Sequence, residues 1–334
     1  MHEPVASPRP GRIPVKLQVS FDAQGERLDR YLSRQLKRYS RQRVQGIIRE
    51  GNLELDGVTE RKPARRLAGG ETIVLWRPLP PEEQPRPPVP VIYQDRELLV
   101  LDKPGDLTVH PSANAYQRTV TGWLKEHHPA FTPAHRLDRE TSGVMVCASR
   151  GAVSARVKGW FLARQVHKCY VALVRGEIPH DGRVEAPIGS DKHSPIRIKM
   201  AVCESGKPAW TDVYVLSRGR EGALLALLPG TGRQHQLRVH CAHLGCPLWG
   251  DKMYGVDPTV FLTFIEEGVD AVLKTVRFRR HMLHQMVLTL PAAEETGVRW
   301  WSAPLPTDFR QAGDVLGVPI LSDDALVGQL LTLL

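Results

Sequence analysis

Residues 135–143 read His-Arg-Leu-Asp-Arg-Glu-Thr-Ser-Gly, which sets one carboxylate, Asp138, between two arginines and just ahead of a turn. The apolar run that follows, residues 143–146, predicts a core strand, and residues 133–137 before it predict a loop. A side chain on a loop braced by a buried strand is held in place and still open to substrate. We expect Thr141 and Ser142 to donate hydrogen bonds to the loop backbone or to the carboxylate. A salt-bridged structural turn is the alternative.

A second polar segment lies about one hundred residues later and reads Gly-Thr-Gly-Arg-Gln-His-Gln-Leu-Arg-Val-His over residues 230–240. It predicts a helix over residues 232–244 that opens with a Thr231-x-x-Gln234 capping box. Arg238 lies one turn from His235, so the two side chains share a helix face. A Gly-Thr-Gly turn at a helix start also suits a phosphate, although alone this signal is weak.

A tyrosine on a predicted strand is the third feature. The strand covers residues 168–174, and its alternation puts Tyr170 on one face with Lys168 and Ala172. A lone strand tyrosine is more often part of the core than part of a site. Further predicted strands cover 97–101, 144–148, 212–216, 223–228 and 286–290, and further predicted helices cover 120–127 and 154–164.

The N-terminal quarter carries most of the chain's net charge of +9. Residues 1–80 contain 16 Lys/Arg and 9 Asp/Glu, and residues 27–49 contain eight bases but only one acid, Asp29. Leu28, Tyr31, Leu32 and Leu36 recur at helical spacing, and so do Val44, Ile47 and Ile48 after a possible N-cap at Ser40. The cationic candidates for a polyanion partner are Arg30, Arg34, Lys37, Arg38, Arg41 and Arg43. A solvated basic face is the alternative.

Prolines mark the domain boundary. Residues 78–90 contain seven of them, which excludes a helix or a central strand and favours a semi-rigid spacer of up to about 40 Å. Before this linker, short strands at 52–55 and 72–75 and a turn at Asp56-Gly57 follow the two helices, so residues 15–77 form a small basic domain after a disordered tail, 1–14. Residues 91–310 form the larger domain, and residues 311–334 are an extension of uncertain structure.

Composition limits the class of protein. The 42% hydrophobic content is enough for a core without disulfides or metals, and the five cysteines are dispersed with no Cys-x-x-Cys pair, which fits a reducing compartment. No apolar run approaches the roughly 20 residues that span a bilayer, and the N-terminus lacks a signal-peptide core. We therefore expect a cytoplasmic protein without membrane contact. The oligomeric state is not readable, and a monomer is expected.

Taken together, these motifs resemble the RluA-type pseudouridine synthases. Asp138 stands in His-Arg-Leu-Asp-x-x-Thr-Ser-Gly, Tyr170 in Lys-x-Tyr, and Arg238 in Gly-Arg-x-His-Gln-x-Arg-Val-His, and the run Leu-Val-Leu-Asp-Lys-Pro-Gly at 99–105 with Val-His-Pro at 109–111 resembles the family's opening segment. The resemblance covers residues 91–310. Many members carry a small RNA-binding module, named after a ribosomal small-subunit protein, in front. The fold expected is α+β, with a mixed, mainly antiparallel sheet flanked by helices after a helix-helix-strand domain.

The resemblance implies an isomerase that detaches uracil from its ribose within RNA, turns the base and rejoins it through carbon, with no cofactor or metal. Asp138 matches the catalytic aspartate, Arg238 its ion-pair partner with Arg233 as a substitute, and Tyr170 the tyrosine that stacks under the base and moves a proton. Arg136 matches the arginine that fills the space left by the flipped nucleotide. Large-subunit ribosomal RNA is the expected substrate, with transfer RNA as the alternative.

Two other classes of function compete with this one. A metal site is suggested by His235, His240, Cys241, His243 and Cys246, but their spacing fits neither a His-Glu-x-x-His helix nor a Cys-x-x-Cys ribbon. A non-catalytic RNA-binding protein is the second alternative. It has no use for a carboxylate that faces a polyanion, so we expect Asp138 to separate the two readings.

Overall fold

The computed structural model describes residues 12–36, 39, 41–78, 86–110, 118–176, 180–292 and 297–334. The chain divides into two compact units, residues 1–84 and 85–334, and each is described by itself. Lys37, Arg38 and Ser40 lie outside the described residues, as do residues 1–11 of the expected tail and 79–85 of the expected linker. Among the described residues, no helix has both the length and the apolar character needed to span a membrane.

The first unit packs two helices, α1 (Leu28–Gln35) and α2 (Arg41–Arg49), on an antiparallel sheet. The sheet order is β1 (Arg12–Gln18), β4 (Thr72–Pro78), β2 (Leu53–Leu55) and β3 (Val58–Thr59), and a short 3-10 turn, η1 (Phe21–Ala23), precedes α1. The apolar residues of the two helices meet Leu53 and Ile73 in one core. This confirms the helices and strands that the sequence predicted from residue 28 onward.

Two details of the first unit concern its chain ends and its turn. Residues 12–14, which we expected in the tail, form the start of β1 and pair with the end of β4. Asp56 and Gly57 join β2 to β3 with φ values of 47° and 81°, so both central residues of this tight hairpin lie in the left-handed region. The predicted Asp-Gly turn is confirmed. Strand β1 was missed although Ile13, Val15 and Leu17 alternate with Pro14, Lys16 and Gln18, because a proline within such a run argues against a strand.

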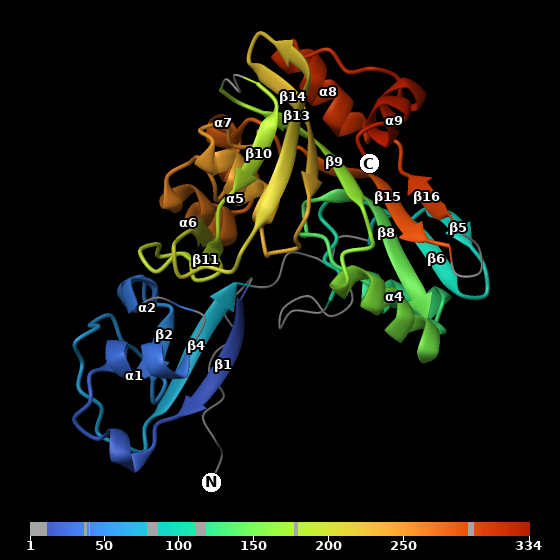
Figure 1. Ribbon diagram of the computed structural model, residues 1–334. Helices are drawn as coiled ribbons and strands as arrows, with labels where there is room; N and C mark the ends of the chain where they lie inside the picture. Colours follow the sequence, from blue (N-terminus) through green and yellow to red (C-terminus); the bar gives the residue numbers. More distant parts are fainter. Residues whose placement is uncertain are drawn as a thin grey trace. The chain divides into compact units, whose positions relative to one another are not determined.

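The second unit is built on one large sheet, which Figure 1 shows in the order β10, β13, β14, β9, β15, β8, β6 and β5. Strand β16 pairs with β15, β7 pairs with β8, and β11 and β12 form a separate hairpin. The strands are β5 (Val91–Gln94), β6 (Leu98–Lys103), β7 (Phe131–Pro133), β8 (Ser142–Ser149), β9 (Lys168–Val174), β10 (Gly182–Glu185), β11 (Ile188–Ser190), β12 (Met200–Val202), β13 (Trp210–Gly219), β14 (Gly222–Pro229), β15 (Leu283–Pro291) and β16 (Val298–Ser302). Within the described residues, the strand pairings of the large sheet are antiparallel except that between β15 and β8. The predicted fold class, mixed but mainly antiparallel, is confirmed.

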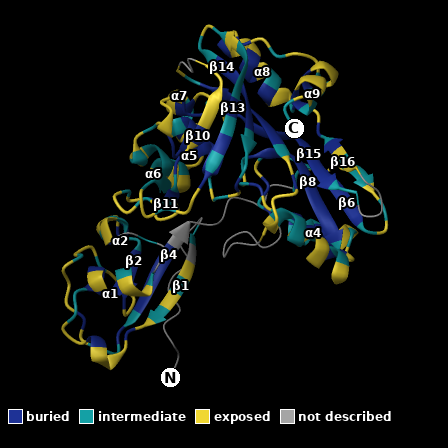
Figure 2. Ribbon diagram, viewed as in Figure 1, coloured by how far each residue is buried: buried dark blue, intermediate teal, exposed yellow. Residues whose placement is uncertain are grey.

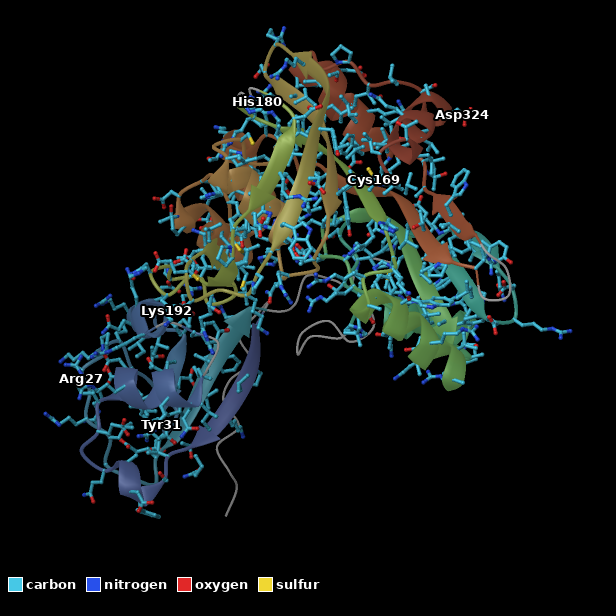
Figure 3. All side chains as sticks on the ribbon, viewed as in Figure 1. Arg27, Tyr31, Cys169, His180, Lys192 and Asp324 are labelled. Atoms are coloured by element: carbon cyan, nitrogen blue, oxygen red, sulfur yellow. The ribbon has the colours of Figure 1, made fainter. Side chains whose placement is uncertain are left out.

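Helices cover the sheet from two directions. The described helices are α3 (Val120–His127), α4 (Ala152–Leu162), α5 (Gln236–His243), α6 (Pro258–Glu267), α7 (Leu273–Val276), α8 (Thr307–Leu316) and α9 (Asp323–Leu331), with a 3-10 turn η2 (Asp270–Val272). Helices α3 and α5 contribute to the core that contains Tyr170 and Ala172, whereas α8 and α9 pack in the core that contains Cys169 and Val171. Alternate residues of β9 therefore serve opposite faces of the sheet, as predicted. Figure 2 shows the central strands as buried, and Figure 3 labels Cys169 on β9.

The C-terminal residues 311–334, whose structure the sequence left open, are helical and belong to the second unit. Phe309 and Leu316 of α8 and Leu326 and Leu330 of α9 are buried against the sheet. At the other end of this unit, Val91 begins β5 after residues 86–90, which have no regular structure. The second core thus extends beyond residue 310, where we had expected the larger domain to end.

Candidate active site

The loop between β7 and β8 carries Asp138, and two hydrogen bonds tie its first residues to Val146 of β8. The amide of Val146 donates to His135 Nε2 at 3.0 Å, and the amide of Ala134 donates to the carbonyl of Val146 at 3.0 Å. His135 therefore faces the sheet, while Arg136 is exposed and Asp138 is partly exposed. Burial, with a smaller contribution from Lys168, lowers the pKa of His135 to about 3, so its neutral ring accepts the amide hydrogen.

A buried lysine at the end of β6 bonds to the same loop. Lys103, at the end of β6, is fully buried and donates through Nζ to the carbonyls of Pro104 at 2.8 Å, Leu107 at 2.9 Å and Arg139 at 3.1 Å. Burial, helped by the charge of Arg280, lowers the pKa of Lys103 to about 7, whereas its three donated bonds favour the protonated form. The opening segment of the larger domain and the Asp138 loop are thereby joined at one side chain.

The threonine and serine after Asp138 do not bond where the sequence analysis expected. Thr141 Oγ1 lies 2.8 Å from Nε2 of His281, and Ser142 Oγ lies 2.9 Å from Nδ1 of His284. Both hydroxyls thus connect the loop to β15 and to the residues just before it, rather than to the loop backbone or the carboxylate. Gly143 has φ 115°, and a methyl group there would overlap the backbone of Gln285, so the close approach of the two strands requires glycine.

Arg238 of α5 reaches Asp138 across about one hundred residues of sequence. Its Nη1 lies 3.2 Å from Asp138 Oδ2, while its Nε and Nη2 lie 2.7 and 2.9 Å from the two carboxylate oxygens of Asp251. Asp251 is fully buried and also accepts the amides of Met253 and Tyr254. Burial alone would raise the pKa of Asp251, but the charge and hydrogen bonds of Arg238 outweigh it and lower that pKa. The guanidinium is therefore fixed by Asp251 and presents its remaining edge to Asp138.

The start of α5 differs from the predicted capping box. The helix begins at Gln236, four residues later than expected, and its N-cap His235 is in the left-handed region with φ 57°. Thr231 Oγ1 donates to Gln236 Oε1 at 2.7 Å, and the amide of Arg233 donates to the same oxygen at 3.0 Å. Gln236, rather than Gln234, therefore closes the turn, and the capping-box prediction is wrong.

His235 lies beside the ion pair, but as the left-handed N-cap of α5 it does not share a helix face with Arg238, so that prediction is wrong. Its Nδ1 lies 2.9 Å from the hydroxyl of Tyr254, and its Nε2 lies 4.0 Å from Asp138 Oδ2. Burial, helped by the charge of Arg238, lowers the pKa of His235 to about 4, so the ring is neutral at pH 7. The hydroxyl of Tyr254 that bonds His235 Nδ1 also accepts the amide of Met200 at 3.0 Å, so the ring is held in place from the side away from Asp138.

Tyr170 comes to the same place from β9. Its side chain is 8% exposed and lies on the wall of a cavity of about 850 Å³ that is also lined by Asp138 and Arg238. Burial, and secondarily the charge of Asp138, raises the pKa of the Tyr170 phenol, which is therefore protonated at neutral pH. The three residues that the sequence analysis assigned to catalysis are thus brought together on one cavity.

The arginines expected near the RNA divide into two groups. Arg136 and Arg233 line the cavity, but Arg233 directs its Nε to the carbonyl of Pro208 at 3.0 Å, so the ion-pair partner of Asp138 in this structure is Arg238. In the first unit, Arg34 pairs with Glu26, Arg43 with Glu50 and Arg41 with Asp29. Arg30 is exposed.

His240 and Cys246 of the rival metal site bond to protein groups. His240 bonds Thr211 Oγ1 through Nδ1 at 2.9 Å and the carbonyl of Ala186 through Nε2 at 3.0 Å, while the thiol of Cys246 donates to the carbonyl of Cys241 at 3.3 Å. Within the described residues, no three His, Cys, Asp or Glu side chains are grouped so as to hold a metal ion.

Three residues of the site were missed from the sequence. Asp251 and Tyr254 lie in a segment without periodicity, and Lys103 was quoted only as part of a motif. Lys103 ends an otherwise apolar strand, and a charged residue in such a place indicates a buried partner. This signal was present in the sequence. For Asp251 the sequence offered none, because its partner is thirteen positions away in a different element.

Comparison with known proteins agrees with this geometry. Residues 97–243 match the family model of RNA pseudouridylate synthases, and residues 26–73 match that of the S4 domain. The chain is similar to ribosomal large subunit pseudouridine synthase D of Pseudomonas aeruginosa, with 36% identity over 315 residues that cover 87% of this chain and 92% of the relative. The protein of the same name from Pasteurella multocida is 32% identical over 315 residues, which cover 91% of this chain and 95% of the relative. The solved structure of human RNA pseudouridylate synthase domain containing 1 is 29% identical, covers 75% of this chain and 97% of its own, and has a TM-score of 0.59.

Proposed function

Because the chain belongs to the RNA pseudouridylate synthase family and is an isomerase that converts uridine to pseudouridine in RNA, we propose that it acts on large-subunit ribosomal RNA. Two relatives that align with almost the whole chain are named as synthases for that RNA. The S4 domain in front supports a structured RNA substrate, because its cationic residues contact phosphates regardless of base sequence.

Asp138 is the proposed catalytic residue, and one observation carries this assignment. Its carboxylate is 21% exposed on the cavity wall and receives Arg238 on Oδ2, while no hydrogen bond within the described residues reaches Oδ1. A carboxylate paired with an arginine at one oxygen and open at the other suits attack, or assistance, at the ribose while the glycosidic bond breaks. Arg238 then acts as a positioning residue that Asp251 holds in turn.

The target uridine is proposed to enter this cavity by leaving its stack. Tyr170 offers a flat, protonated ring beside Asp138, which supports stacking and hydrogen-bond donation, because the raised pKa makes loss of the phenol proton costly. Exposed Arg136, two positions before Asp138, is proposed to fill the space that the flipped nucleotide leaves.

Mapping of pseudouridines in total cellular RNA, with and without this gene product, tests the substrate. We expect one or a few uridines of large-subunit ribosomal RNA to stay unmodified without it, and loss of a transfer-RNA pseudouridine instead would select the alternative substrate.

Asp138→Asn should lower the single-turnover rate by more than about 10³-fold, because the nucleophile or its equivalent is removed, and should leave RNA affinity within a few-fold. Persistent modification by this variant would overturn the role of Asp138.

A further inference from the structure

A second aromatic ring lines the cavity, and the proposed reaction does not use it. Trp210, the first residue of β13, is half-buried and lines the same cavity as Asp138 and Tyr170. The guanidinium carbon of Arg164 lies 4.5 Å from the centre of the Trp210 ring. Arg164 follows α4, so the contact joins two elements that are distant in sequence.

The backbone of Trp210 is fixed by the segment that leads to Arg238. The amide of Trp210 donates to Thr231 Oγ1 at 3.3 Å, and its carbonyl accepts the side chain of Gln236 at 2.8 Å and the amide of Gly230 at 3.1 Å. The pyrrole part of the ring lies against Gly230, where a methyl group would overlap the indole nitrogen. A ring held in this way loses little conformational freedom when a ligand stacks on it.

Arg164, by contrast, is held weakly. Its side chain is exposed, its backbone is in the left-handed region with φ 59°, and no hydrogen bond or ion pair of its guanidinium is found within the described residues. A nucleobase stacked on an aromatic ring is bound more strongly than an exposed cation over such a ring. A base can therefore displace this guanidinium, which is then free to pair with the phosphate of that nucleotide.

We propose that Trp210 is a stacking platform for a base that neighbours the extruded uridine, and that Arg164 is its displaceable cover and moves to the adjacent phosphate. The ligand class is a nucleobase of single-stranded RNA. This inference rests on the proposed function only in that RNA enters the cavity. It adds a second base subsite, distinct from Tyr170, which explains why a large aromatic side chain stands at the start of β13 beside the cavity.

The test compares two probes on the full-length chain: a dodecamer of uridylate, and a dodecamer with the same phosphates whose sugars carry no bases. Both probes engage the cationic surface equally, so the ratio of their affinities reports stacking alone. Trp210→Leu keeps an apolar side chain without a ring, and Trp210→Phe keeps a ring. Trp300→Leu is the control, because Trp300 is 49% exposed on β16 and does not line the cavity.

We expect Trp210→Leu to lower the uridylate-to-abasic affinity ratio by about tenfold, as for the loss of one stacked base, and Trp210→Phe to keep it within about threefold. Arg164→Gln should weaken both probes by a similar factor, because it removes a phosphate contact. An unchanged ratio in Trp210→Leu would overturn the inference and leave the proposed function intact, with Arg164 and Trp210 acting as a structural contact. Failure of the unsubstituted chain to bind the uridylate probe at all would overturn both.

Discussion

Each unit of this protein holds an aspartate against arginine, and the two carboxylates are used differently. Asp29 in the first unit is fully buried, and its carboxylate accepts hydrogen bonds from Arg27 at 3.0 Å, Arg41 at 2.9 Å and Gln45 at 2.6 Å. Asp138 in the second unit is partly exposed and receives Arg238 on one oxygen. A carboxylate surrounded by donors holds the fold together, whereas one with an unoccupied oxygen on a cavity is available for chemistry.

The second unit separates these two tasks between two aspartates. Asp251 resembles Asp29, since it is fully buried and accepts two bonds from Arg238 and two from backbone amides. Arg238 can therefore stay in place without Asp138, and Asp138 contributes little to holding the helix. The comparison predicts that the structural and chemical effects of these carboxylates are separable by substitution.

The largest expected effect is that of Asp251→Asn. It leaves a buried guanidinium without its main partner, so the free energy of unfolding should fall by about 3–5 kcal/mol in chemical denaturation. A displaced Arg238 should also lower turnover on the order of 100-fold. Asp138→Asn is the matched control and should unfold within about 1 kcal/mol of the parent. If Asp251→Asn has parental stability and no activity, Asp251 belongs to the chemistry and the separation is wrong.

The second largest effect is expected from acid, which should lower the stability of the second unit at a higher pH than that of the first. Burial lowers the pKa of His284 from 6.5 to about 4, so between these values the unfolded chain binds more protons than the folded one. The second unit should therefore lose up to about 3 kcal/mol of stability from this residue as pH falls from 6.5 to 4. The described part of the first unit contains no histidine, and the pKa of Asp29 is lowered, because hydrogen bonds from Arg27, Gln45 and Arg41 outweigh its burial.

The contribution of Asp29 is accordingly lost only as pH falls below its unfolded value of 3.8. Unfolding curves at pH 4 to 7 should show the acid-sensitive transition in the second unit. His284→Gln, which keeps one donor and one acceptor, should make its pH slope shallower by the share of one proton, because His135 and His235 contribute shares of their own. The same pH slope in His284→Gln as in the parent would assign the acid sensitivity to other groups.

Local sequence patterns set the limit of what could be predicted. Residues 120–127 and 168–174 were predicted to the residue, because helical spacing of apolar residues and a run of branched and aromatic residues are both visible locally. Asp138, Tyr170 and Arg238 were found because they lie in motifs of a known family. Asp251, Lys103 and the bonds of Thr141 to His281 were not predicted, because each partner comes from a distant element and only tertiary packing brings the pair together.

A smaller effect is expected for Asp29→Asn. Two arginines lose a charged acceptor, but both are partly exposed and are rehydrated, so the first unit should lose about 2 kcal/mol of stability. Hydrogen exchange of α1 and α2 amides measures this loss locally. Glu50→Gln, which removes the exposed 3.5 Å pair with Arg43, is the control and should cost less than about 1 kcal/mol. Single-turnover rates on saturating RNA should not change in either variant.

The smallest effect separates the arginines of the first unit from one another. Arg30 is exposed and has no ion pair within the described residues, whereas Arg41 is bound to Asp29. If Arg30 neutralises a phosphate, Arg30→Gln should make the slope of log affinity against log salt shallower by about 0.7, the value for one contact on a single strand, with unfolding unchanged. Arg41→Gln should instead lower the stability of the first unit, because it removes a donor from a buried carboxylate. RNA titrations at several salt concentrations measure the slope, and an equal slope in Arg30→Gln and the parent would mean that this exposed cation does not touch RNA.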